Sequence, residues 1–212
     1  MGAEGDKLLI MLRDRPVVAW SIAALEGSKV VDSIVVVASE RNLEQLAAVI
    51  AAVDCTLPVE LVLGGARRQD SVGIAVTYLE NAAPEIVLVH DGARPLVSPG
   101  LVQAVVDAAR EHGAATAGLP LKNACKEVDG DGFVRRSLER ASLVSVQTPQ
   151  GFRYELLSRA HQEARALGGV ADDDAELVER LGERVKVVPG DYRNLKITTP
   201  DDLAAAEAHL AS

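Results

Sequence analysis

The residues best suited to chemistry follow an apolar run at 86–90, IVLVH, which predicts a strand buried on both faces of a parallel sheet. Asp91 comes directly after this run, and Gly92 would let a ligand approach the backbone. Open α/β sheets place their ligands at such carboxyl ends, so Asp91 is a candidate ligand for a metal or a polar substrate. The guanidinium of Arg94 adds a forked pair of N–H donors that can bind an anion. An Asp-Gly pair is also typical of a simple turn.

A second group of candidates lies at 64–71, where the segment GGARRQDS joins a predicted strand to a predicted helix. Gly64 and Gly65 would let the backbone pass close to a ligand, and the helix amino terminus would offer free N–H groups to an anion. Arg68 favours a nucleotide, and Ser71 either caps the helix or binds the ligand. Lys7, on a glycine-containing loop, is a further candidate for phosphate, although a plain connection with a solvated lysine explains the same residues.

The elements that must position these residues alternate between strand and helix, which favours an α/β class with a mostly parallel sheet. Apolar patterns and capping residues predict strands at 34–38, 58–63, 86–90, 114–118 and 185–188, and helices at 16–27, 40–53, 72–79, 100–112, 152–167, 172–181 and near the carboxyl terminus.

Residues 122–147 interrupt this alternation, because a D-G-D-G turn separates two short strand-like runs. An isolated hairpin is marginally stable in water, so we expect this β-arm to rest on a partner surface and to form a homodimer. The acidic triplet at 172–174 opens a helix, where carboxylates offset the helix dipole.

Composition sets the broad class of the protein. The 212 residues, 48% of them hydrophobic, suit a single domain over 1–212. A formal net charge of −9 argues against nucleic-acid and acidic-membrane partners. No stretch reaches the roughly 18 apolar residues of a membrane span, and the amino terminus lacks a signal-peptide core. Cys55 and Cys125 lack a metal-ligand pattern, so we expect a cytoplasmic protein.

Five ordered blocks give the chain a resemblance to a known family. They are GGARRQDSV at 64–72, VLVHDGARP at 87–95, SVQTPQGF at 145–152, DDDAELVE at 172–179 and NLKITTPDDL at 194–203. Together they resemble the 2-C-methyl-D-erythritol 4-phosphate cytidylyltransferases of the non-mevalonate isoprenoid pathway. The resemblance implies a Rossmann-like nucleotidyltransferase domain with a protruding β-arm, and transfer of CMP from CTP to a polyol phosphate with release of pyrophosphate.

The resemblance also assigns roles to residues of this chain. Asp91 matches the carboxylate near Mg²⁺ and the triphosphate, and Lys7 and Lys196 match catalytic lysines beside the phosphates. The nucleotide-binding set is Gly64, Gly65, Arg68, Ser71 and Asp91. The acceptor-binding set is Arg94, Arg140, Thr148 and Asp172, with Arg140 reaching across to the other subunit. These residue types suit the implied reaction, because in-line attack on the α-phosphorus needs cations and positioning more than it needs a general base.

Departures from the family pattern leave alternatives open. Asn123-Ala124 stands where an Asp-Thr pair is frequent, and Asp172 stands where threonine is common. A cytidylyltransferase for another polyol phosphate, such as ribitol 5-phosphate, is therefore a second hypothesis. A third is a non-catalytic nucleotide-binding homodimer. The family usually begins with a strand and a glycine-rich loop bearing an arginine, and we expect such a segment upstream of Met1.

Overall fold

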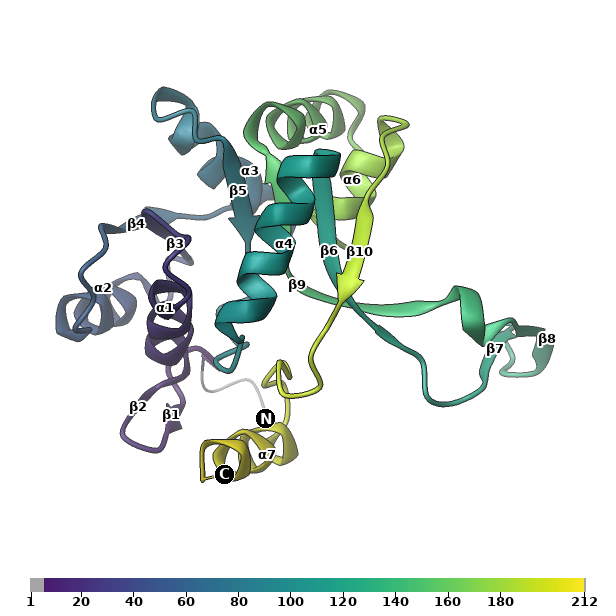
Figure 1. Cartoon of the computed structure of the whole chain (residues 1–212), viewed down its shortest axis with the longest axis horizontal. Helices are drawn as coiled ribbons and strands as arrows, with labels where there is room; N and C mark the ends of the chain where they lie inside the picture. Colours follow the sequence, from purple (N-terminus) through teal and green to yellow (C-terminus); the bar gives the residue numbers. More distant parts are fainter. Residues whose placement is uncertain (1–5, 212) are drawn as a thin grey trace.

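The computed structural model describes residues 6–211, in which strands and helices alternate over most of the chain (Figure 1). The elements are β1 (Met11–Leu12), β2 (Arg15–Pro16), α1 (Val17–Gly27), β3 (Ile34–Ala38), α2 (Leu43–Ala52), β4 (Val59–Leu63), α3 (Arg68–Tyr78), η1 (Leu79–Asn81), β5 (Ile86–Val89), α4 (Pro99–His112), β6 (Ala114–Pro120), β7 (Cys125–Val128), β8 (Val134–Leu138), η2 (Arg140–Ser142), β9 (Val144–Arg153), α5 (Tyr154–Leu167), α6 (Asp174–Arg180), β10 (Lys186–Pro189) and α7 (Pro200–Ala211). The fold is mixed α/β.

The expected mostly parallel sheet is wrong for these residues. The main sheet has four strands in the order β10-β6-β9-β5, and only β10 and β6 run parallel. Strand β9 is antiparallel to both β6 and β5, because the chain returns from the arm without the helical crossover that parallel neighbours require. Strand β5 was expected to be buried on both faces, but its four residues are half-buried. A separate parallel pair joins β3 and β4.

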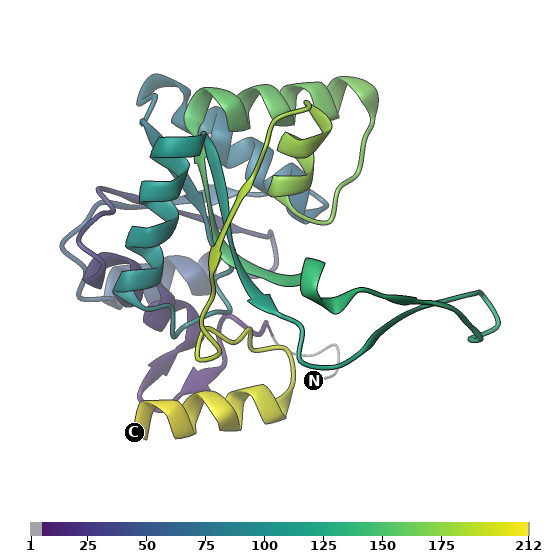
Figure 2. The same ribbon diagram turned by 45° about the vertical axis from the view of Figure 1, so that its right-hand side comes forward.

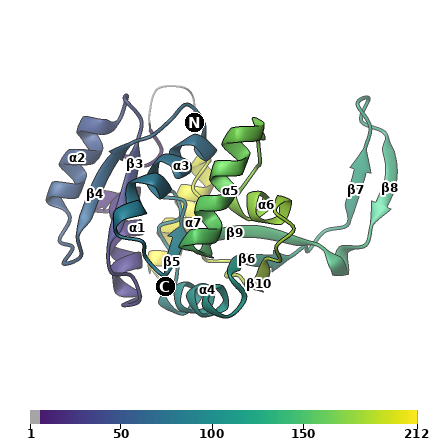
Figure 3. The ribbon, with the colours of Figure 1, turned by 90° about the horizontal axis from the view of Figure 1, so that it is seen from above.

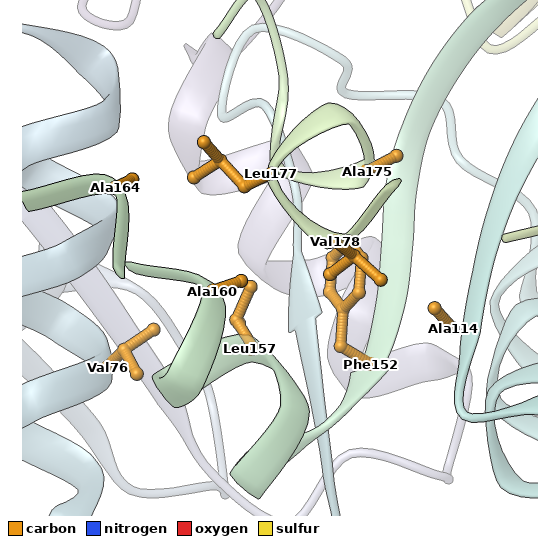
Figure 4. Close-up of a cluster of buried hydrophobic side chains, with 9 residues drawn as sticks. All are labelled: Val76, Ala114, Phe152, Leu157, Ala160, Ala164, Ala175, Leu177 and Val178. Atoms are coloured by element: carbon orange, nitrogen blue, oxygen red, sulfur yellow. The ribbon is translucent and has the colours of Figure 1, made fainter. Parts of the chain in front are cut away.

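Helices cover both faces of the four-stranded sheet (Figure 2). On one face, α4 packs against β6, β9 and β10. On the other face, α5 and α6 pack over Phe152 of β9, in the cluster drawn in Figure 4. Successive residues of β6 serve the two cores, Ala114 one and Ala115 the other, as the alternation of a strand requires. Full burial of a side chain such as Phe152 contributes about 1.5–3 kcal/mol to stability.

A second unit consists of α1, α2, β3 and β4, whose shared core centres on Ile22, Ile34 and Leu46. Among the described residues, β3 has a strand neighbour only in β4, and β5 only in β9. The strand and loop expected upstream of Met1 lie outside the described residues.

Within the predicted arm at 122–147, the structure has the expected hairpin, formed by β7 and β8. Strands β7 and β8 pair antiparallel, and the Asp129 carboxylate accepts the N–H groups of Asp131 and Phe133 to close the turn. The hairpin projects away from the helices and the sheet, as Figure 3 shows from above. Within residues 6–211, three of its apolar side chains are more than half exposed, Phe133 most of all at 73%.

Two helix starts show how local residues set the elements that carry the site. Helix α4 begins at Pro99 with the Ser98 hydroxyl accepting the Leu101 N–H at 3.3 Å, as predicted. Helix α3 begins at Arg68, earlier than the predicted start at 72. The Asp70 carboxylate accepts the Arg67 N–H at 3.2 Å and pairs with its guanidinium, which closes the first turn.

Candidate active site around Asp91

Asp91 follows β5 and lies among three cations from distant parts of the chain. Its Oδ2 lies 3.0 Å from Lys196 Nζ and 3.3 Å from Arg94 Nε, and its Oδ1 lies 3.9 Å from Arg68 Nε. Arg68 opens α3, Arg94 ends the turn after β5, and Lys196 precedes α7. The structure therefore brings together four of the residues that the sequence singled out.

The charges at this centre favour an anionic ligand. Only 15% of the Asp91 side chain is exposed, and burial alone would raise the pKa of its carboxyl. The attraction and hydrogen bond of Lys196, with the charges of Arg94 and Arg68, outweigh burial and lower that pKa. Asp91 is thus ionised at neutral pH, and together with Asp174, which pairs with Arg68, it leaves one of the three nearby positive charges unbalanced. A centre with this excess can bind phosphate groups in an otherwise acidic protein.

A second carboxylate holds Arg68 in place. Asp174 Oδ2 lies 2.8 Å from Arg68 Nη1, and Asp174 Oδ1 lies 3.0 Å from Nε2 of the buried His161. The Asp174 side chain is only 1% exposed. The sequence interpretation missed this residue, because it treated the acidic triplet as a set of dipole-offsetting side chains. The available signal was that Asp174 shares one helical face with Leu177 and Val178, which are buried.

The glycine pair at the end of β4 folds tightly against the first turn of α3. A Cβ on Gly64 would lie 2.6 Å from Ser71 Oγ, and one on Gly65 would lie 2.6 Å from Asp70 Cβ. The Ser71 hydroxyl accepts the Gly65 N–H at 3.1 Å and donates to the Arg67 carbonyl at 3.1 Å. These contacts by themselves require glycine at both positions and fix the loop that presents Arg68.

The turn after β5 is tied to β9 and to the segment before α7. Thr148 Oγ1 accepts the Asp91 N–H at 2.9 Å, and its carbonyl accepts the Asn194 Nδ2 group at 2.8 Å. Arg94 Nη1 donates to the Asn194 carbonyl at 2.7 Å. Asn194 is fully buried and was not among the sequence candidates. Burial lowers the pKa of His90 to about 4, so the ring is neutral at neutral pH.

Three predicted site residues lie outside these contacts: Lys7, Arg140 and Asp172. Lys7 precedes Leu8, whose side chain lies against Gly92, but within residues 6–211 its ammonium group has no ion-pair or hydrogen-bond partner. Arg140, at the base of the arm, donates to the Lys122 carbonyl of its own chain at 2.6 Å. The Asp172 side chain is exposed, and its N–H donates to Glu176 Oε2.

The donor set limits the kind of metal that this centre could hold. Across the described part of the chain, no three His, Cys, Asp or Glu side chains cluster as a metal site. A cation at Asp91 would need most of its ligands from water or substrate. Mg²⁺ bound with a nucleotide triphosphate fits that donor set, because it retains waters and takes phosphate oxygens beside one or two carboxylates.

The family profile of 2-C-methyl-D-erythritol 4-phosphate cytidylyltransferase matches residues 1–212, the full length of the sequence. The chain belongs to this cytidylyltransferase family. A curated member from Pelotomaculum thermopropionicum is 47% identical over 212 residues, covering 98% of this chain and 87% of that protein. The family resemblance found in the ordered motifs is thereby confirmed.

Solved structures agree with this assignment. A 4-diphosphocytidyl-2C-methyl-D-erythritol synthase from Anaerococcus prevotii superposes with a TM-score of 0.89 at 28% identity, covering 98% of this chain and 94% of that one. The 2-C-methyl-D-erythritol 4-phosphate cytidylyltransferase of Thermus thermophilus gives a TM-score of 0.79 at 35% identity, with coverages of 97% and 94%.

No helix within 6–211 has both the length and the apolar character to cross a membrane.

Proposed function

We propose that this protein transfers CMP from CTP to 2-C-methyl-D-erythritol 4-phosphate at the Asp91 centre and releases pyrophosphate. The observation that carries the proposal is the convergence of Arg68, Arg94 and Lys196 on one buried carboxylate. In-line attack by the acceptor phosphate places negative charge on the equatorial oxygens and on the leaving pyrophosphate. Fixed cations at this centre stabilise that charge as it develops.

The nucleotide is assigned to the β4–α3 side of the centre. The Gly64–Gly65 loop and Ser71 shape the cytidine end, and Arg68 extends from the same loop toward the phosphates. Lys7 and Lys196 are the proposed phosphate lysines. When bound, Mg²⁺ supplies charge neutralisation of the triphosphate, and Asp91 is the residue that would hold it.

The acceptor is assigned to the opposite side of Asp91. Arg94 is the proposed anchor for its phosphate, because this guanidinium, on a side chain that is only 11% exposed, is fixed by the Asn194 carbonyl. Thr148 and Asp172 complete the acceptor set in this proposal, with Arg140 contributed by a second subunit. Asn123-Ala124 alters the arm beside Arg140, which keeps ribitol 5-phosphate as a second acceptor hypothesis and a non-catalytic nucleotide-binding homodimer as a third.

The homodimer is part of the proposal, because the arm is a two-stranded hairpin with exposed apolar residues. Val128, Phe133 and Val134 are 54%, 73% and 60% exposed. A hairpin of this kind is not independently stable in water, and a second copy of the chain would cover it.

The reaction is tested by pyrophosphate release from CTP and Mg²⁺ with each acceptor supplied separately. Release with 2-C-methyl-D-erythritol 4-phosphate, and much slower release with ribitol 5-phosphate, is the expected result. The reverse preference would reassign the acceptor. CTP binding without release with either compound would favour the non-catalytic hypothesis.

The contribution of Arg140 across the dimer is tested by mixing two inactive variants, Arg140→Ala and Asp91→Ala. In a mixed dimer, one site would carry both changes and the other neither, so activity should reappear. Arg135→Ala, a change at a nearby exposed arm arginine, serves as the control and should stay active alone. Persistent inactivity after demonstrated subunit exchange would place Arg140 in its own subunit's site or outside any site.

A further inference from the structure

A closed ring of hydrogen bonds links His90 to the turn that carries Asp91 and Arg94. The Asp91 N–H donates to Thr148 Oγ1 at 2.9 Å, and Thr148 Oγ1 lies 3.3 Å from His90 Nδ1. His90 Nε2 lies 3.1 Å from the Arg94 carbonyl, and the Arg94 N–H donates to the Asp91 carbonyl at 2.9 Å.

The chemistry of these atoms allows one direction for the ring. A carbonyl oxygen only accepts, so His90 Nε2 must carry the proton that faces Arg94. Thr148 Oγ1 already accepts from the Asp91 N–H, and its own hydroxyl proton is free to point at His90 Nδ1, which must then be unprotonated. The neutral Nε2–H tautomer satisfies every partner in the ring.

The ring acts on the two charged side chains through their backbone. Asp91 and Arg94 sit at the two ends of one turn, and that turn is fastened to itself and, through Thr148, to β9. β9 is the central strand between β6 and β5 and is buried at Thr148. The distance between the Asp91 carboxylate and the Arg94 guanidinium therefore depends on β9, although neither residue belongs to that strand.

We propose that His90 is a positioning residue, whose ring in the Nε2–H tautomer fixes Asp91 relative to Arg94. This inference rests on the proposed function, in which those side chains serve the nucleotide and the acceptor respectively. His90 touches neither substrate in this proposal. Its loss would leave both charged groups in the site but change their relative placement, and small misplacements of reacting groups slow the chemical step more than they weaken binding.

The kinetic test compares His90→Phe, which removes both ring hydrogen bonds, with His90→Gln, whose amide can still donate to the Arg94 carbonyl. We expect kcat to fall about 10²-fold in the phenylalanine variant, with a much smaller change in the Kd of CTP. Glutamine should recover about tenfold of that loss, the effect of one hydrogen bond. His112→Gln, at the exposed end of α4, is the matched control and should leave kcat unchanged.

A second kinetic test adds Thr148→Val to His90→Phe and compares kcat at saturating acceptor, because Thr148 also belongs to the proposed acceptor set. Because the two residues belong to one ring, the double variant should be little worse than either single variant. The proposal would be overturned if the double variant lost kcat by the product of the two single losses, or if His90→Phe kept full activity.

Nitrogen-15 NMR of the wild-type histidines tests the ring even if His90→Phe fails to fold or the enzyme has another acceptor. We expect His90 to give the Nε2–H pattern at pH 7, and this pattern should persist in Thr148→Val, because the Arg94 carbonyl still requires a proton on Nε2, while the Nδ1 resonance shifts as it loses the Thr148 hydroxyl. A Nδ1–H pattern, or rapid exchange between tautomers in the wild type, would overturn the positioning role. Absence of turnover in the wild type, with the expected pattern present, would refute the proposed reaction and leave the ring intact.

Discussion

Replacing Asp91 with asparagine should separate metal-dependent catalysis from metal-free binding of the nucleotide. The substitution keeps the size of the side chain but removes the negative charge within 4 Å of Lys196, Arg94 and Arg68. With Mg²⁺ present, we expect turnover to fall about 10²-fold or more, the scale of losing one preorganised electrostatic contact. Without the metal, the triphosphate would meet three cations, of which only Arg68 would still pair with a carboxylate, that of Asp174.

The size of the metal-free effect follows from the charges. At roughly 6 Å and an effective dielectric constant near 20, repulsion between one carboxylate and one phosphate charge is about 3 kcal/mol. The side chains of Lys196 and Arg68 are 36% and 38% exposed, so solvent and salt screen part of this repulsion. A net gain of about 1–2 kcal/mol remains, which corresponds to CTP binding about 5–30-fold more tightly.

Titration calorimetry with CTP, in EDTA and in Mg²⁺, measures both parts of this prediction, and pyrophosphate release measures turnover. Asp14→Asn is the matched control, because Asp14 is an exposed carboxylate paired with Arg15 away from the centre. Weaker metal-free CTP binding in Asp91→Asn would refute the charge argument. Undiminished turnover at saturating Mg²⁺ would refute the assignment of Asp91 to the metal.

Three further changes test the surroundings of the centre. The folded-state pKa of His90 is about 4 against an ordinary value near 6.5, so between these values only the unfolded chain binds the proton. Stability should therefore fall by about 3 kcal/mol as pH drops from 7 to 4, and urea unfolding of His90→Gln should show a shallower pH dependence. Asp174→Asn should lower the free energy of unfolding by about 1 kcal/mol, because Arg68 loses its nearest carboxylate but is 38% exposed and stays partly solvated, and stability unchanged in urea would contradict this. Gly65→Ala should weaken CTP binding because its Cβ would meet the following helix at 2.6 Å, whereas Gly27→Ala, with open space around it, should bind CTP normally.

Local sequence patterns were sufficient for most helices and strands. The predicted strand at 34–38 coincides with β3, and the Ser98-Pro99 start of α4 follows from a capping hydroxyl and a fixed proline φ. The hairpin at 125–138 follows from its turn residues. These features depend on neighbours within a few residues, so the chain encodes them directly. The same holds for the ordered motifs that indicated the family.

The direction of strand pairing required the tertiary structure. Strand β9 was not among the predicted strands, and its antiparallel contacts with β5 and β6 depend on the path through the arm. The predicted start of α3 was too late, because the two glycines and two arginines before it favoured a loop. In the structure, the Asp70 carboxylate closes the first helical turn, so the helix begins earlier.

Residue type and position by themselves identified Asp91, Arg68 and Arg94 as candidates, because cations and a carboxylate beside predicted strand ends are chemically conspicuous, and the family resemblance added Lys196. Their convergence within 4 Å was decided by tertiary packing, since the contacts join residues up to 105 positions apart. The supports of this centre, Asp174, Asn194 and His90, acquire that role only in the fold, although the helical spacing of Asp174 with Leu177 and Val178 was a signal for its burial. A polar side chain supports a site through its three-dimensional neighbours, and residue type and local spacing do not specify those neighbours.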